Sequence, residues 1–402
     1  MSRDLTETAT AEVTALAGAS GWTWELADAC AAAVVTSPEL RVKVAYAAET
    51  YRWVDILCTL EQRRAELPDR PAEVRRPKLS DPAGLAHQLI AEASGSGRIT
   101  LLAGRLREAG VRTAALTSGL HPLWHGPGLR VITEIDHQAA SSLRELEQIR
   151  PDDNLPCVTG IPEELEPGDD PAAPHVGSLR SAREPAIAVA GQPVPGPPLT
   201  LETRAMLLHA ALTGIEIASL EICAQNILVY RNAPLDFARD MARQAWDEGR
   251  HCAALVERLE QIGSGLGAYP PLANQMLGLV NGISLPLSVC AVQRIGEWRG
   301  LDALFRLSGE LSALGDEESA QMILTQAHDE TLHVGFGNRW LKAFTASPEE
   351  TWAIHEAALE LRGMRRHSVM SDAPPSHIPQ WAAVQSGFDE GELAQIGWKP
   401  LA

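Results

Sequence analysis

The chain has 402 residues, of which 45% are hydrophobic and only 5% aromatic, and its formal net charge at pH 7 is −18. This length favours two domains, and the excess of carboxylates argues against a nucleic-acid substrate, because a phosphate backbone attracts clustered Lys and Arg. No apolar run approaches the roughly 18 to 20 residues needed to cross a bilayer, which argues against a membrane-spanning protein.

The cysteines and the start of the chain bear on its compartment. The polar segment Met1–Glu7 lacks the apolar core of a signal peptide. No C-x-x-C pair occurs among Cys30, Cys58, Cys157, Cys223, Cys252 and Cys290. We therefore expect a cytoplasmic protein with neither a disulfide framework nor a zinc knuckle.

The first 150 residues are expected to form a helical domain of unknown role. Apolar residues recur at three-and-four spacing through residues 1–66. Prolines interrupt the pattern at Pro68, Pro71 and Pro77. A second helix is predicted for Asp81–Ala109, with Asp81 as its cap. Thr117–Gly128 is turn-like, and another helix is predicted for Val131–Ile149.

Residues 151–199 are rich in Pro, Gly and acidic residues and end in the run Gln192–Pro198. Repeated proline removes backbone donors and disfavours helix, so this segment is expected to be an extended connector between domains. The alternative is a long loop inside one domain.

Residues 200–345 are expected to form the second domain. Predicted helices cover Thr200–Tyr230, Pro234–Gly263, Ser284–Gly300, Asp302–Leu314 and Asp316–Phe344, with an irregular helical segment from Leu272. Residues 346–402 are expected to form a helix to about His367, followed by a loop and tail. The fold class is therefore all-α.

One pattern occurs twice in this domain. Glu216 is followed 32 residues later by Glu248-Gly-Arg-His251, and Glu297 is followed 33 residues later by Glu330-Thr-Leu-His333. Residues three apart share a helix face, so each E-x-x-H brings a carboxylate and an imidazole to one point. Two such pairs with a Glu from each of two other helices are the ligand set of a bundle-held di-iron or di-manganese centre. The predicted ligands are Glu216, Glu248, His251, Glu297, Glu330 and His333.

A further E-x-x-H, Glu134-Ile-Asp-His137, has no matching partner helix. This spacing arises by chance roughly once in a chain of this length at average composition. We therefore expect the Glu134 copy to be a coincidence, although its role stays open.

Each C-terminal E-x-x-H is preceded directly by an aspartate, Asp247 or Asp329. A ligating imidazole needs its far N–H held, commonly by a carboxylate. We expect both aspartates to play this part, the alternative being solvated helix charges. Arg250 either bridges to such an aspartate or forms a surface ion pair.

The ligands and the Asp-Glu-x-Arg-His form resemble the ferritin-like di-iron carboxylate superfamily. More narrowly, residues 200–345 resemble an uncharacterised bacterial ferritin-like family known only as a domain of unknown function. That family is distantly similar to bacterial tRNA-modifying di-iron hydroxylases. The segments that carry the likeness are Gly300–Asp302, Gly315–Ser319 and Asp329–Trp340. The resemblance implies a ferritin-like four-helix bundle with a crossover connection.

Carboxylate oxygens with only two imidazoles suit iron or manganese better than zinc or copper. The resemblance implies an O₂-dependent oxygenase or oxidase with two Fe ions, or Mn, acting on a small organic molecule of specialised metabolism. The reaction would be hydroxylation, N-oxygenation, desaturation or oxidative cleavage, with an external electron donor left open. Alternatives are ferritin-like iron handling, a structural metal site and a tRNA hydroxylase. The sequence does not reveal the substrate or the oligomeric state.

The substrate is expected one helical turn from the ligands. The candidate lining residues by spacing are Leu212, Thr213, Ser219, Leu220, Gln244, Ala245, Gln293 and Gln326. His209 either lines the site or is an ordinary core histidine. Arylamine N-oxygenases of the superfamily carry an extra His at the position of Gln326, a departure that argues against that subtype. Glycines that could let helices approach are Gly214, Gly249, Gly296, Gly335 and Gly337.

Overall fold

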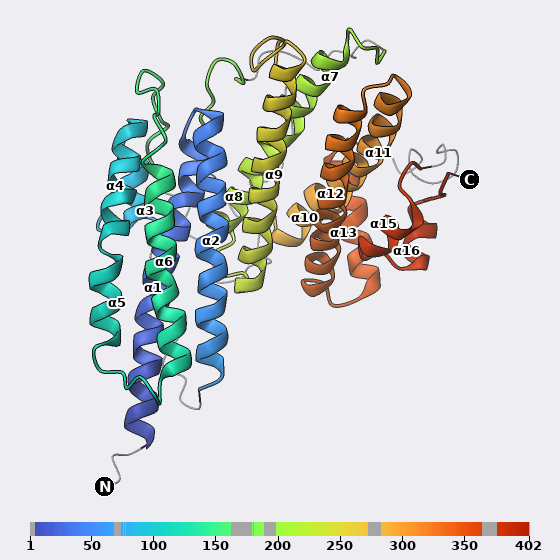
Figure 1. Ribbon diagram of the computed structural model, residues 1–402. Helices are drawn as coiled ribbons and strands as arrows, with labels where there is room; N and C mark the ends of the chain where they lie inside the picture. Colours follow the sequence, from blue (N-terminus) through green and yellow to red (C-terminus); the bar gives the residue numbers. More distant parts are fainter. Residues whose placement is uncertain are drawn as a thin grey trace. The chain divides into compact units, whose positions relative to one another are not determined.

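The computed structural model describes residues 5–67, 74, 76, 78–161, 179, 181–188, 198–271, 283–363 and 376–401. Within these residues, all regular secondary-structure elements are helices. The one β-type pairing among them is an isolated bridge between Ser376 and Pro400. The all-α fold class is confirmed (Figure 1). The ferritin-like arrangement of four helices stays a prediction.

The N-terminal helices are α1 (Leu5–Thr36), α2 (Leu40–Ala65), α3 (Leu85–Ala91), α4 (Gly95–Arg107), α5 (Ala109–Thr117) and α6 (Gly126–Leu146). Next come α7 (Arg204–Ala211), the π-helix η2 (Leu212–Glu216), α8 (Ile217–Val229) and α9 (Leu235–Gln261). The last are α10 (Leu285–Val289), the π-helix η4 (Cys290–Gly296), α11 (Glu297–Ala313), α12 (Glu317–Ala343), α13 (Pro348–Leu361), α15 (Gln380–Gln385) and α16 (Glu390–Gln395).

The chain divides into two compact units, each assembled from separate stretches of sequence. Unit 1 comprises residues 1–167, 177–184 and 220–249, and unit 2 comprises residues 168–176, 185–219 and 250–402. The expected segments 1–150, 151–199, 200–345 and 346–402 stay a prediction.

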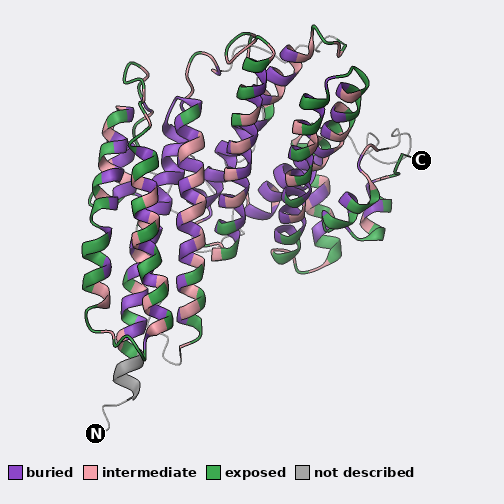
Figure 2. Cartoon of the chain, viewed as in Figure 1, coloured by how far each residue is buried: buried purple, intermediate pink, exposed green. Residues whose placement is uncertain are grey.

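Helix α1 is the central element of unit 1 and contacts α2, α3, α5 and α6. Every residue from Leu26 to Val35 is buried. Figure 2 colours the described chain by burial. A helix that is apolar on nearly all sides must be surrounded by other elements. The Ala-rich sequence of this stretch lets its neighbours pack closely.

An ion cluster around the fully buried Lys43 and Glu221 ties three segments of unit 1 together. Lys43 on α2 lies 2.9 Å from Glu221 on α8, and Arg183 lies 2.9 Å from the other oxygen of the same carboxylate. The Lys43 ammonium also donates to the carbonyl oxygens of Val34 and Val35 at the end of α1. Buried charges persist only when they are paired and hydrogen-bonded in this way.

Unit 2 is held together by contacts of α12 with α10, η4, α11, α13 and α15. Asp316 caps α12 by accepting a hydrogen bond from the Ser319 N–H at 3.2 Å. Arg294 of η4 is fully buried and donates to His355 at 3.3 Å and to Glu392 at 3.1 Å. These bonds fasten α13 and α16 to the π-helix.

The expected single helix Asp81–Ala109 is wrong, because the chain forms α3, α4 and α5 there. The first break lies at Glu92–Ser94, where the Ser94 hydroxyl accepts a hydrogen bond from the Gly97 N–H at 3.1 Å and caps α4. Such local side-chain bonds compete with helix continuation. Asp81 does not cap α3, because its carboxylate accepts from the Ala83 N–H in the turn before the helix.

The expected stop at Gly300 and the separate helix Asp302–Leu314 are also wrong, because α11 runs unbroken from Glu297 to Ala313. A glycine inside a helix costs about 1 kcal/mol relative to alanine, which the packing of α11 against α12 outweighs. The last long helix ends at Leu361, before the predicted His367. The predicted segment from Leu272 and most of the run Gln192–Pro198 lie outside the described residues.

The helical stretch Arg204–Val229 is the one part of the described chain long and apolar enough to cross a membrane, with a mean hydropathy of 1.5. Two thirds of its most apolar window (67%) is buried inside the structure. It also carries the buried carboxylates Glu216 and Glu221. These features are typical of the core helix of a soluble protein, so the stretch is weak evidence for a membrane span.

Candidate metal centre

Two of the predicted ligands are placed by π-helices. Glu216 is the last residue of η2, and Glu297 directly follows η4. A π turn inserts an extra residue into an α-helix and is frequent at functional sites. The two single glutamates of the doubled pattern therefore share a local backbone feature as well as a residue type.

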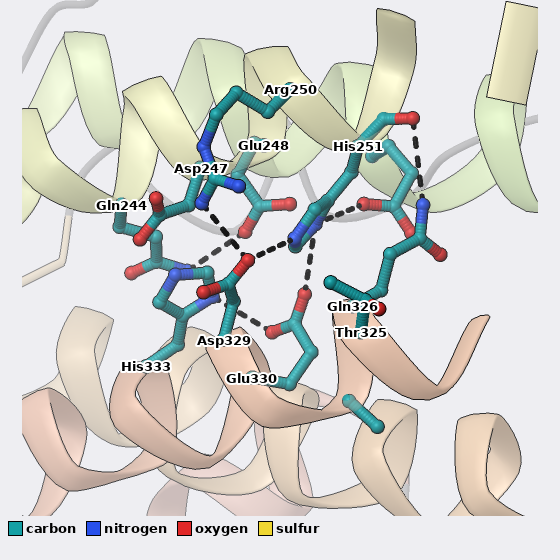
Figure 3. A network of polar contacts seen from close by, with 12 residues as sticks. Gln244, Asp247, Glu248, Arg250, His251, Thr325, Gln326, Asp329, Glu330 and His333 are labelled. Atoms are coloured by element: carbon teal, nitrogen blue, oxygen red, sulfur yellow. Dashed lines mark hydrogen bonds and ion pairs between the residues drawn. The ribbon is translucent and has the colours of Figure 1, made fainter. Parts of the chain in front are cut away.

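Four ligand residues form one buried cluster. Glu216, Glu248, His251 and Glu330 each offer a ligand atom, and these atoms all lie within 4.8 Å of one another. Figure 3 shows Glu248 and His251 on successive turns of α9, with Glu330 reaching toward them from α12. The four side chains could hold a metal ion.

Glu330 lies between two imidazoles. The distance from its Oε2 to His333 Nδ1 is 2.8 Å, and from its Oε1 to His251 Nδ1 is 3.4 Å. His251 Nδ1 also lies 3.1 Å from Glu216 Oε2. Both histidines therefore turn Nδ1 toward the carboxylates, so Nδ1 is the nitrogen available to a metal.

The remaining predicted ligand, Glu297, is buried and lies beside the cluster rather than within the group of four. Its carboxylate accepts a long hydrogen bond of 3.5 Å from the Ser219 hydroxyl. The structure thus groups Glu216, Glu248, His251 and Glu330, places His333 directly against Glu330, and leaves the assignment of Glu297 as a ligand a prediction.

The electrostatic environment keeps Glu330 ionised. Burial raises the pKa of its carboxyl, but the adjacent imidazoles of His333 and His251 outweigh burial and bring the pKa down to about 2. An anionic carboxylate is the form that binds a metal cation.

Asp329 holds the outer nitrogen of one ligand histidine. Its Oδ2 lies 3.1 Å from His251 Nε2 and accepts a bond of 2.9 Å from Arg250 (Figure 3). A carboxylate in this position fixes the ring orientation and keeps Nδ1 turned toward the ligand carboxylates. Asp247 is fully buried and pairs with Arg243 at 2.8 Å on its own helix, so its expected bond to a histidine stays a prediction.

A cavity of about 820 Å³ opens next to the cluster, within unit 2. Glu216, Glu297 and Glu330 line one end of it, and most other lining side chains are apolar or small and come from α7, η2 and α11. Its volume falls within the range of roughly 300 to 1,000 Å³ common for small-molecule sites.

The assignment of the expected pocket residues to a substrate site stays a prediction. None of Leu212, Thr213, Ser219, Leu220, Gln244, Ala245, Gln293, Gln326 and His209 lines this cavity, and all are buried. Ala211 lies next to the π-helix η2 and Gly214 and Ile215 lie within it, and all three line the cavity.

Three of these residues make other contacts near the cluster. Gln244 donates to Glu248 at 3.1 Å, and Gln326 donates to the His251 carbonyl oxygen at 3.5 Å. His209 accepts from the Gly267 N–H at 3.2 Å and packs edge-on against Tyr269. Burial lowers the pKa of His209, as for the ordinary core histidine considered above.

The third E-x-x-H lies on the surface of unit 1. The side chains of Glu134 and His137 are 62% and 79% exposed, and their nearest charged atoms are 3.7 Å apart. Two such groups on one helix with water around them do not make a metal site.

The sequence carried a longer repeat than the E-x-x-H pairs. Gln244-Ala-Trp-Asp-Glu-Gly-Arg-His251 and Gln326-Ala-His-Asp-Glu-Thr-Leu-His333 share the form Q-A-x-D-E-x-x-H. Aligning the two helices at their ligands would have placed Gln244 and Gln326 in equivalent positions, one turn before each glutamate. In the structure both make hydrogen bonds to cluster residues.

Fold and site together define an all-α protein with a buried carboxylate and imidazole cluster that could bind a metal ion. The chain belongs to the family described as "Protein of unknown function (DUF455)", whose model matches residues 140–368, more than half of its length. The predicted likeness to a family of unknown function is confirmed, while ferritin-like membership stays a prediction. No curated protein and no solved structure matches the chain.

Proposed function

We propose that this protein is an O₂-dependent oxidoreductase of the cytoplasm that uses two iron or manganese ions to oxidise a small organic substrate. The observation that carries the proposal is the cluster of Glu216, Glu248, His251 and Glu330, whose ligand atoms lie within 4.8 Å of one another in the protein interior. Buried charges of this kind are paired or coordinate metals.

The donor atoms fit iron or manganese. Carboxylate oxygens are hard ligands, and imidazole suits iron as well as zinc. None of the six cysteines is among the cluster residues, so the soft thiolate ligands that select copper(I) or zinc are not part of the set.

His333 and Glu330 would help to hold a second ion. The Oε1 atom of this carboxylate faces His251 and its Oε2 atom faces His333. A carboxylate between two imidazoles would be available to both cations, and Glu297 would be a further ligand for the second one. This arrangement agrees with the four-glutamate, two-histidine pattern of helix-bundle dimetal proteins.

When bound, two such ions supply the electrons that reduce O₂ in a site shielded from water. Inserting one oxygen atom into a C–H bond converts the other to water and requires two electrons and two protons, which an external reductant would deliver. The chain's own residues bind and orient: Asp329 fixes the His251 ring, and the largely apolar cavity beside Glu216 would receive the substrate.

The proposal is tested by anaerobic titration of the metal-free protein with Fe(II), followed by exposure to O₂. We expect binding to saturate at about two ions per chain, and O₂ to be consumed with a transient visible absorbance. A protein that binds metal but never consumes O₂ when reduced would instead hold a structural site, and the proposal would be wrong.

Replacing Asp329 by asparagine should weaken metal binding without changing the fold. The amide keeps the shape of the side chain but removes the negative charge that orients and polarises His251. Loss of such an outer partner typically weakens metal affinity about 10- to 100-fold. Competition with a metal chelator measures the change, and unchanged affinity would show that Asp329 serves only its ion pair with Arg250.

A further inference from the structure

The cavity beside the cluster is long and follows one helix. Its lining residues on α11 and the following turn include Glu297, Gly300, Ala303, Leu307 and Leu314, which share one face at three-and-four spacing. From Glu297 to Leu314 this face extends about 25 Å at 1.5 Å per residue. The cavity is therefore a trough along α11 rather than a round chamber.

The opposite wall is also apolar. It is formed by Leu199, Leu207, Ala210, Ala211 and Ile215. Away from the three carboxylates at the inner end, the charged lining residues are Arg306 and Glu310, which are exposed and pair with each other at 2.9 Å. A ligand in this trough meets apolar walls along its length and a neutral ion pair near the rim.

Small side chains set the width of the trough. Ala210, Ala211 and Gly214 face it from one wall, and Gly300 and Ala303 from α11. Larger residues at these positions would close the space. The shape therefore fits a narrow, flexible chain better than a fused ring system.

We propose that this trough binds one extended hydrocarbon chain as the substrate of the site, with one segment of the chain against Glu216, Glu297 and Glu330. The inference rests on the proposed function, because the buried ligand carboxylates at the inner end are what distinguish this trough from a protein-docking groove. The polar end of the molecule lies at the rim, near Arg306 and Glu310.

Binding is tested with cis-parinaric acid, a chain-shaped fatty acid that fluoresces in apolar surroundings, displaced by saturated primary alcohols of increasing length. Each added methylene should tighten competition about fourfold, the equivalent of 0.8 kcal/mol, until the trough is filled. Competition that does not depend on chain length would overturn the proposal.

A variant that narrows the trough gives the second test. Ala303→Phe places a ring in the middle of the lining face, and Ala353→Phe adds the same ring at an exposed position on α13 that does not line the cavity. We expect the first to weaken probe binding more than about tenfold and the second to leave it unchanged. Equal affinity of the two variants for the probe would overturn the proposal. A protein dimer that dissociates only in Ala303→Phe would show that this face binds a second copy of the protein and not a hydrocarbon chain.

The two proposals fail separately. Probe binding is measured on the metal-free protein and needs no O₂. Chain-length-dependent binding without O₂ consumption would refute the oxidoreductase and keep the binding site. Uptake of O₂ by the iron-loaded protein without chain-length dependence would refute the hydrocarbon substrate alone.

Discussion

Replacing Glu330 by alanine should abolish binding of both metal ions, the largest effect expected of any single ligand change. The Glu330 carboxylate faces both imidazoles, at 3.4 Å from His251 and 2.8 Å from His333. Its removal takes a negative ligand from each ion at once. Anaerobic loading with Fe(II), removal of free metal and elemental analysis measure the ions retained per chain.

The matched control is Glu134→Ala, which removes the glutamate of an exposed E-x-x-H in unit 1. This variant should retain the full metal content. His333→Ala should lose only the ion on its own side, since His251 and Glu216 remain. Far-ultraviolet circular dichroism confirms that each variant keeps its helices. If Glu330→Ala retained both ions in the folded protein, the cluster would not be the metal site.

Much of the helical fold was predictable because long amphipathic helices have a regular spacing of apolar residues in the sequence. The predicted Pro234–Gly263 became α9 (Leu235–Gln261), and the predicted Asp316–Phe344 became α12 (Glu317–Ala343). In both, apolar spacing is regular and the ends carry Pro, Asp or Gly signals. The prediction of one helix over Asp81–Ala109 was wrong because the Ser94 hydroxyl accepts a hydrogen bond from the Gly97 N–H and starts a new helix. The spacing of apolar residues does not reveal such a local hydrogen bond.

The ligands of the candidate site could be proposed from sequence because the chemistry repeats. Two E-x-x-H pairs at nearly equal distances from two glutamates form a pattern that one copy alone would not establish. The cavity could not be proposed in the same way. Its lining includes Gly214, Ile215 and Glu216 of the π-helix η2, and a π turn leaves no mark in a count of 3.6 residues per turn.

The links that fasten unit 2 were equally hidden from sequence. Arg294 lies three residues before Glu297, and an arginine at this position would be expected on the surface. It is instead fully buried and donates hydrogen bonds to residues 61 and 98 positions away. Its partners His355 and Glu392 lie on helices that no motif connects to the ligands. Long-range burial of a charge is decided by tertiary packing, which local patterns do not carry.

Replacing Gly337 by alanine should destabilise the protein by about 3 kcal/mol, because overpacking against an unyielding neighbour costs roughly 1 to 3 kcal/mol or more. An added Cβ at Gly337 would lie 2.5 Å from the backbone nitrogen of Arg294 and 2.7 Å from the carbonyl carbon of Gln293. Backbone atoms cannot rotate away as a side chain can. Helix α12 would have to move off η4, and Glu297 directly follows η4. Urea unfolding monitored by circular dichroism measures the loss.

Gly335→Ala is the matched control, because it makes the same change two residues earlier on the same helix. Its added Cβ would lie 3.6 Å from the Gln385 carbonyl oxygen and 4.0 Å from the Ser386 carbonyl oxygen, which are ordinary contacts. Alanine is favoured over glycine inside a helix by about 1 kcal/mol, so this variant should be as stable as the parent or more so. The same helix-propensity gain applies at Gly337, and the difference between the two variants therefore isolates the close approach of α12 to η4. Equal stability of the two variants would show that η4 yields without cost and that Gly337 does not set the distance between the helices that carry His333 and Glu297.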